Sequence, residues 1–156
     1  MAGLCSLKRL NGAAARLYEE AFAAEPKLAE DPSSSNCDNV ACAAALAGCG
    51  RGLDADKIDA RARGRLRRQA LDWLHADRSA WDRLLEKEPD KVRQVIVQNL
   101  KHWLEDPDLA GVRGSQALSM LPESESRPWQ TLWTDLADTM ARAQRKSTRE
   151  NSSDAR

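Results

Sequence analysis

Apolar residues recur at helical spacing along most of the chain. In the segment 12–25 they lie three, four, seven and eight positions apart, at Ala14, Leu17, Tyr18, Ala21 and Phe22. The segment 36–48 is rich in small apolar residues; Asn36 or Asp38 can cap its start, and Gly48 and Gly50 favour a stop after it. Both segments are therefore predicted to be helices.

Three longer apolar stripes follow. The segment 60–88 carries the strongest one and predicts either one bent helix or two helices broken near Asp77. The segment 90–105 repeats the spacing up to Asp106 and Pro107, which close it. A short helical turn is expected at 115–120, and a last helix continues to Ala143, with Pro122 or Pro128 in its first turn. Strand signals are nearly absent, so the predicted class is all-α.

Length and composition favour a single soluble domain. The 156 residues include 42% hydrophobic and 31% charged side chains, with 24 basic and 24 acidic groups and no net charge. This balance argues against a nucleic-acid or anionic-membrane binder, because both need a sustained positive field. A protein or peptide partner is expected instead. No apolar run approaches the roughly 18 residues of a membrane span and no leader pattern is visible, so we expect a cytoplasmic protein.

The predicted organisation is a lead over 1–11, a helical domain over 12–144 and a disordered polar tail over 145–156. The sequence shows no glycine-rich phosphate loop, since a helical segment rather than a strand precedes Gly48, Gly50 and Gly52. Metalloprotease, nucleophile-elbow and kinase catalytic motifs are also missing. We therefore expect no catalytic residues and no cofactor.

The two histidines and four cysteines are candidate catalytic or metal-binding residues. His75 and His102 each lie within two residues of a tryptophan on an apolar stripe, which favours surface positions at the stripe edge over catalytic bases. A cryptic enzyme that gathers them with carboxylates stays as an alternative. The cysteines (Cys5, Cys37, Cys42 and Cys49) match no metal or redox spacing, although some could meet a histidine in space. No metal site is predicted, and Cys42 and Cys49 are interpreted as small buried apolar residues.

An arginine run precedes the tryptophan-rich half of the chain. It comprises Arg61, Arg63, Arg65, Arg67 and Arg68. With Trp73 and Trp81 behind it, the run could bind a nucleic acid through stacking and charge. Arginines two apart on a helix point to different faces, which favours a solvated helix start instead. The five tryptophans are expected mainly in the core.

The first helical segment resembles the second helix of a tetratricopeptide repeat. The resemblance rests on its small, aromatic, small, large and proline positions, at Ala14, Tyr18, Ala21, Phe22 and Pro26. The stretch 39–48 then resembles the first helix of the next repeat. The usual tryptophan is missing there, and Asp38 stands where an aromatic residue would be expected.

A broader resemblance covers about 14–143. The segments 17–29, 39–50, 66–81 and 102–113 are similar, in this order, to the C-terminal tetratricopeptide region of large bacterial serine/threonine protein kinases. The chain departs from that family in its serine-rich loop at 31–37, and it contains no kinase domain, so ATP binding and phosphotransfer are not expected. The 1–11 lead would be the remnant of a preceding repeat.

This resemblance implies a single tetratricopeptide-like array of antiparallel helix pairs that acts as a docking or scaffold module. If the repeat register holds, Asp38, Asn39 and Cys42 face the partner groove. Two alternatives remain at this stage. The chain could be a structural C-terminal cap of a longer repeat array, or a helical nucleic-acid-binding domain that uses the Arg61 to Arg68 run.

Overall fold

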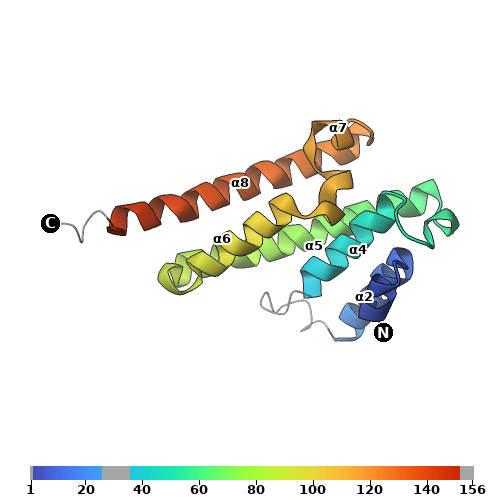
Figure 1. Cartoon of the computed structure of the whole chain (residues 1–156), viewed down its shortest axis with the longest axis horizontal. Coiled ribbons are helices and arrows are strands. Elements are labelled where there is room, and N and C mark those ends of the chain that lie inside the picture. Colours follow the sequence, from blue (N-terminus) through green and yellow to red (C-terminus); the bar gives the residue numbers. More distant parts are fainter. Residues whose placement is uncertain (1, 26–35, 152–156) are drawn as a thin grey trace.

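The computed structural model describes residues 2–25 and 36–151, and all regular structure within these ranges is helical. The all-α prediction is therefore confirmed. The α-helices are α1 (Ala2–Leu7), α2 (Asn11–Ala24), α4 (Asn36–Gly48), α5 (Ala60–Lys87), α6 (Pro89–Glu105), α7 (Gly114–Leu118) and α8 (Glu123–Asn151), with 3₁₀ turns η1 (Ala55–Lys57) and η2 (Pro107–Val112) (Figure 1). The polar connection predicted at 26–35 lies outside the described residues. Among the described helices, none has both the length and the apolar character needed to cross a bilayer.

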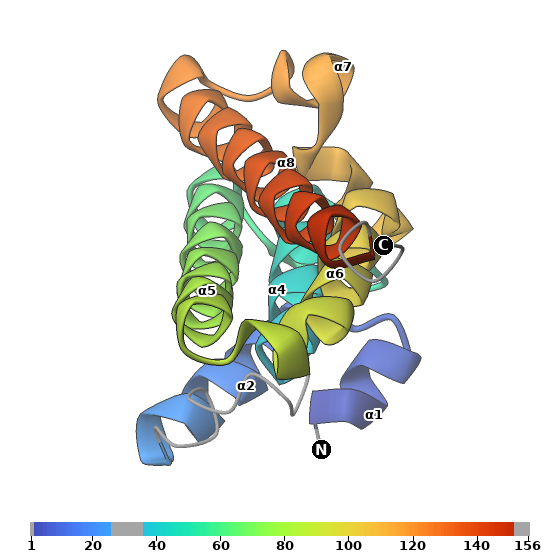
Figure 2. The same ribbon diagram turned by 90° about the vertical axis from the view of Figure 1, so that its left-hand side faces the viewer.

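Helix α4 lies at the centre of the fold. It contacts α2, α5 and η2, and Figure 2 shows it between α5 and α6 with α1 and α2 below it. Its small side chains are almost fully buried: Val40, Ala41, Ala43, Ala44, Ala45 and Ala47. Small side chains allow neighbouring helix axes to approach closely. Because a Cβ on Gly48 would lie 3.0 Å from the backbone oxygen of Arg63, α4 and α5 are nearly in backbone contact there.

Helix α5 is one continuous helix. The Asp59 carboxylate accepts a hydrogen bond from the Ala62 amide at 2.7 Å and caps its start. The sequence leaves open a break near Asp77, but Asp77 is buried inside the helix and the turn continues through it. Trp81 then packs against Trp103 of α6, with ring centroids 4.5 Å apart, and joins the two helices.

Helix α8 crosses α5 and α6 and closes the core from the opposite side to α1 and α2 (Figure 2). Trp129, Leu132 and Leu136 on its inner face are no more than 1% exposed. Pro122 immediately precedes the helix, whereas Pro128 lies within it, beyond the expected first turn. The helix also runs to Asn151, although the sequence predicts a disordered tail from 145 onward. Residues 144–150 include glutamine, arginine, lysine and glutamate, which have high helix propensity.

Candidate functional site

A concave pocket of about 470 Å³ opens between α1, α2 and α4. Helix α1 and the turn after it supply Gly3, Leu7 and Arg9. The other lining residues come from α2, α4, the loop after α4, and η2: Asn11, Tyr18, Asn39, Cys42, Ala43, Leu46, Arg51, Gly52 and Asp108. We call this the α1–α2–α4 pocket. Its lining combines apolar, amide and charged side chains, as recognition pockets commonly do.

The rim of the pocket is fixed by hydrogen bonds between two loops. The Leu53 amide donates to the carbonyl oxygen of Arg9 at 2.8 Å, and the side-chain amide of Asn11 donates to the carbonyl oxygen of Arg51 at 3.0 Å. Gly52 adopts φ 129°, and a Cβ there would lie 3.0 Å from the Arg9 oxygen. Glycine is thus required at this close approach. The bonds hold two arginines at the rim, and both side chains are exposed.

The three residues predicted to face a groove are placed differently. Asn39 is exposed and Cys42 is buried, and both line the α1–α2–α4 pocket. Asp38 is half-buried and is not part of the lining. It belongs instead to a cluster of four side chains, Asp38, Cys42, His102 and Asp106, which we call the α4–α6 cluster.

The α4–α6 cluster brings a thiol, an imidazole and two carboxylates together. The Cys42 thiol donates to Asp106 Oδ2 at 3.4 Å, and its sulfur lies 3.9 Å from Asp38 Oδ1. His102 Nε2 lies 3.5 Å from Asp106 Oδ2 and 3.7 Å from Asp38 Oδ2. One ligand atom each from Asp38, Cys42 and Asp106 all lie within 4.8 Å of one another. Each of these residue types can ligate a metal ion.

Both carboxylates are oriented by neighbours outside the cluster. Asp106 Oδ1 accepts a hydrogen bond from the Asp108 amide at 2.8 Å, which caps η2 and leaves Oδ2 directed at the cluster. The Trp103 side chain acts on Asp38 as a donor that partly offsets the raised pKa of this carboxyl. An Arg113 guanidinium nitrogen donates to the carbonyl oxygens of Trp103 and Asp106, at 2.7 and 2.9 Å, and fixes the backbone between them. These contacts orient the two carboxylates and the backbone that carries Asp106.

Burial dominates the electrostatics of the cluster. It raises the pKa of Asp38 above its usual value; nearby His102 opposes this and Asp106 adds to it. Burial also raises the pKa of the Cys42 thiol far above its ordinary value, and the charges of Asp38 and Asp106 reinforce the effect. At neutral pH the thiol is consequently protonated unless a cation binds beside it.

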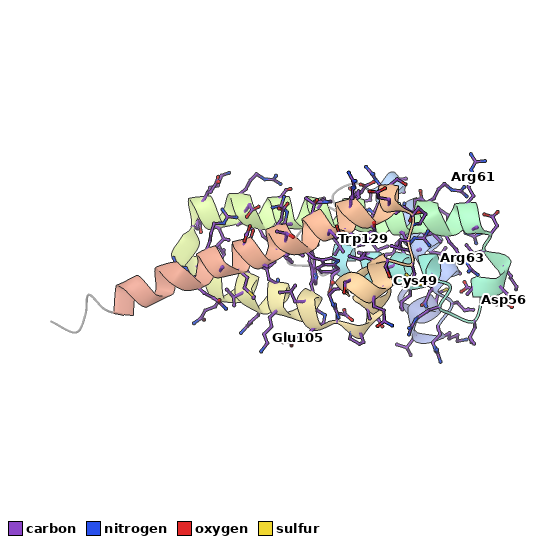
Figure 3. The ribbon with its side chains drawn as sticks, turned by 90° about the horizontal axis from the view of Figure 1, so that it is seen from above. Cys49, Asp56, Arg61, Arg63, Glu105 and Trp129 are labelled. Carbon is purple, nitrogen blue, oxygen red and sulfur yellow. The ribbon has the colours of Figure 1, made fainter. Side chains whose placement is uncertain are left out.

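The arginine run does not form a single exposed surface. Arg63 donates to the Ala55 carbonyl oxygen at 3.0 Å, and Arg67 forms a two-pronged ion pair with Glu125 of α8 at 2.7 and 3.1 Å. Figure 3 shows Arg61 extending away from the ribbon, whereas Arg63 lies over the body of the protein. Two of the five arginines thus form contacts within the protein.

His75, the other histidine of the chain, is half-buried, and burial lowers its pKa.

Sequence reasoning missed the α4–α6 cluster, although one signal for it exists. Asp38 and Cys42 are four residues apart, as are His102 and Asp106, and this spacing places each pair on one side of its helix. Nothing in the sequence shows that the two pairs meet.

No protein-family model, curated protein or solved structure matches this chain.

Proposed function

We propose that the chain is a non-catalytic protein-interaction module that binds an acidic segment of a partner protein in the α1–α2–α4 pocket. The observation that carries the proposal is this pocket, because residues of α1 and α4 line it together and two arginines stand on its rim.

The helix order supports this proposal. In Figure 1, α4 and α5 run in opposite directions, and α2 packs beside α4. If α1–α2 and α4–α5 are successive tetratricopeptide-like pairs, then α1 and α4 are the first helices of their pairs. First helices line the inner surface of such arrays, which is where partner segments bind. Asn39 and Cys42, which the sequence placed on this surface, are among the pocket residues.

The charges on the rim indicate the chemistry of the partner. Arg9 and Arg51 are both exposed beside the pocket, and Asp108 is its one acidic lining residue. Guanidinium groups bind carboxylates through paired hydrogen bonds. An acidic peptide would therefore meet complementary charge at the rim and the exposed side-chain amide of Asn39.

The resemblance to the C-terminal repeat region of bacterial serine/threonine kinases is a second support. In this proposal the partner is a kinase substrate or another part of a kinase chain. We also propose that the module works in the cytoplasm.

Binding of peptides to the purified chain tests the proposal. Arrayed twelve-residue peptides of acidic, neutral and basic composition would be screened, and the best acidic peptide measured by fluorescence anisotropy. We expect Arg51→Glu to weaken that peptide at least tenfold and Asn39→Ala to weaken it less. The matched control is Arg61→Glu, which makes the same charge change at an exposed site on α5 and should leave affinity unchanged.

Two results would overturn the proposal. One is equal binding of acidic and basic peptides; the other is equal loss of affinity with Arg51→Glu and Arg61→Glu. A folded chain that binds no peptide would favour the structural-cap alternative. An oligonucleotide in the same assay tests the nucleic-acid alternative. Arg63 and Arg67 count against this alternative, because both already bind groups within the protein.

A further inference from the structure

Two pairs of potential metal ligands face each other where α4 meets the end of α6. Asp38 and Cys42 lie one helical turn apart on α4, and His102 and Asp106 lie one turn apart at the end of α6. Together they supply one sulfur, one nitrogen and carboxylate oxygens. This mixed donor set goes beyond the peptide-binding role and does not depend on it.

The distances within the cluster are close to those around a tetrahedral metal ion. Zinc binds nitrogen and oxygen at about 2.0–2.2 Å and thiolate sulfur at about 2.3 Å, so ligand atoms in a tetrahedral shell lie about 3.3–3.7 Å apart. Here the Cys42 sulfur lies 3.4 Å from Asp106 Oδ2 and 3.9 Å from Asp38 Oδ1. The His102 Nε2 atom lies 3.5 Å from Asp106 Oδ2 and 3.7 Å from Asp38 Oδ2. Small side-chain rotations would complete such a shell.

The histidine has the freedom that completion requires. One ligand atom from each of Asp38, Cys42 and Asp106 already lies within 4.8 Å of the other two. His102 is not yet within this distance of all three. The His102 side chain is 61% exposed and contacts both carboxylates, so it can rotate toward the sulfur without disturbing the core. Asp38, Cys42 and Asp106 would bind the ion from the protein side, and the His102 imidazole would bind it from the solvent side.

The electrostatic balance of the cluster also favours a cation. Cys42 and Asp106 are 8% and 9% exposed, and placing carboxylates beside a thiol in such surroundings is costly without compensating charge. A divalent ion would compensate both carboxylates and stabilise the thiolate.

We propose that Asp38, Cys42, His102 and Asp106 bind one divalent transition-metal ion, with zinc preferred. Thiolate and imidazole ligands favour zinc over magnesium or calcium, which prefer oxygen alone. Four protein ligands leave no open coordination position, as in structural zinc sites. The ion would link α4 to the end of α6 and thereby stabilise the fold.

Metal titration of the purified full chain tests this proposal. The protein would be stripped with a chelator, desalted under reducing conditions and titrated with Zn²⁺ by calorimetry and with Co²⁺ by absorption. We expect one ion per chain, a cobalt spectrum with tetrahedral and thiolate bands, and proton release as the thiol ionises. At a hundredfold excess over Kd, zinc should raise Tm by about 5–10 °C.

Matched variants locate the ion. Cys42→Ser, Asp106→Asn and His102→Ala should each weaken zinc binding at least tenfold, whereas Cys49→Ser and His75→Gln change the same residue types outside the cluster and should not. Asp106→Asn keeps a side-chain oxygen that can cap η2, and His102 is exposed, so these variants can fold without metal. Circular dichroism of the stripped proteins checks this. Millimolar affinity, or a cobalt thiolate band that survives Cys42→Ser, would overturn the proposal.

Discussion

Replacing Gly48 with alanine should destabilise the protein, because α4 and α5 are too close there to admit a methyl group. A Cβ at this position would lie 2.6 Å from Arg67 Cγ and 3.0 Å from both the Arg63 carbonyl oxygen and the Arg67 amide nitrogen. Favourable carbon–carbon contacts lie at about 3.5–4.0 Å, so the overlap with Arg67 Cγ is about 1 Å. Two of the three neighbours are backbone atoms, which cannot rotate away.

The Arg67 side chain cannot move aside easily either. It is held by Glu125 of α8 through two hydrogen bonds and also donates to the Gly48 carbonyl oxygen, and only 12% of the side chain is exposed. Overpacking of this kind costs about 1–3 kcal/mol, while the better helix propensity of alanine returns at most about 1 kcal/mol. We expect a net loss of about 1 kcal/mol, which in a chain of this size lowers Tm by about 2–4 °C.

Gly64→Ala provides the matched control. Gly64 lies inside α5, and a Cβ there would meet Glu125 Oε1 at 3.4 Å and Arg67 Nη2 at 3.7 Å, which are ordinary contacts. It should therefore raise Tm by about 1–4 °C through helix propensity alone. Thermal unfolding by circular dichroism compares both variants with the parent. A Tm for Gly48→Ala equal to or above that of the parent would refute the close approach of α4 and α5.

Three further predictions concern hydrogen bonds and protonation. Trp133→Phe removes the indole donor that binds the Val112 carbonyl oxygen at 2.7 Å and should cost about 1–2 kcal/mol of unfolding free energy in urea titrations. Asp59→Ala removes the cap on the Ala62 amide and should cost about 1 kcal/mol, whereas Asp59→Asn, which can still cap, should cost less; the same titrations decide. Burial lowers the pKa of His75, so its neutral form is favoured in the folded state and stability is lost as pH falls below about 6.5; Tm measured between pH 7.5 and 5 should fall less for His75→Gln than for the parent.

Local signals predicted the helices well where proline, glycine or capping residues bound an apolar stripe. Pro89 and the Asp106–Pro107 pair bound α6 as expected, and Gly48 ends α4. Prediction was poorer where tertiary contacts decide. A polar Asp77 suggested a break in α5, yet the buried stripe on either side keeps one helix continuous. The turn η2 was not predicted, because its two buried residues, Leu109 and Val112, are too few to show a period.

The α4–α6 cluster could not be predicted from the sequence, for a geometric reason. Cys42 and Asp106 are separated by 64 positions, and each ligand pair alone resembles ordinary polar residues on a helix surface. Only the packing of α4 against η2, which follows α6 directly, brings the pairs together. The tryptophans show the opposite case, since burial of Trp81, Trp103 and Trp129 follows directly from their helical stripes.

Cys42 connects the two proposals, because it lines the α1–α2–α4 pocket and belongs to the α4–α6 cluster. An alanine variant of Cys42 would therefore disturb both and separate neither. Asn39 and Arg51 line the pocket without belonging to the cluster, whereas His102 belongs to the cluster without lining the pocket. If both proposals hold, Arg51→Glu weakens peptide binding at least tenfold and leaves zinc affinity unchanged. His102→Ala weakens zinc binding at least tenfold and leaves peptide affinity, measured without metal, unchanged. Coupling between the sites would appear as a change in peptide affinity on adding zinc to the parent chain, and reciprocity requires that the peptide change zinc affinity by the same factor.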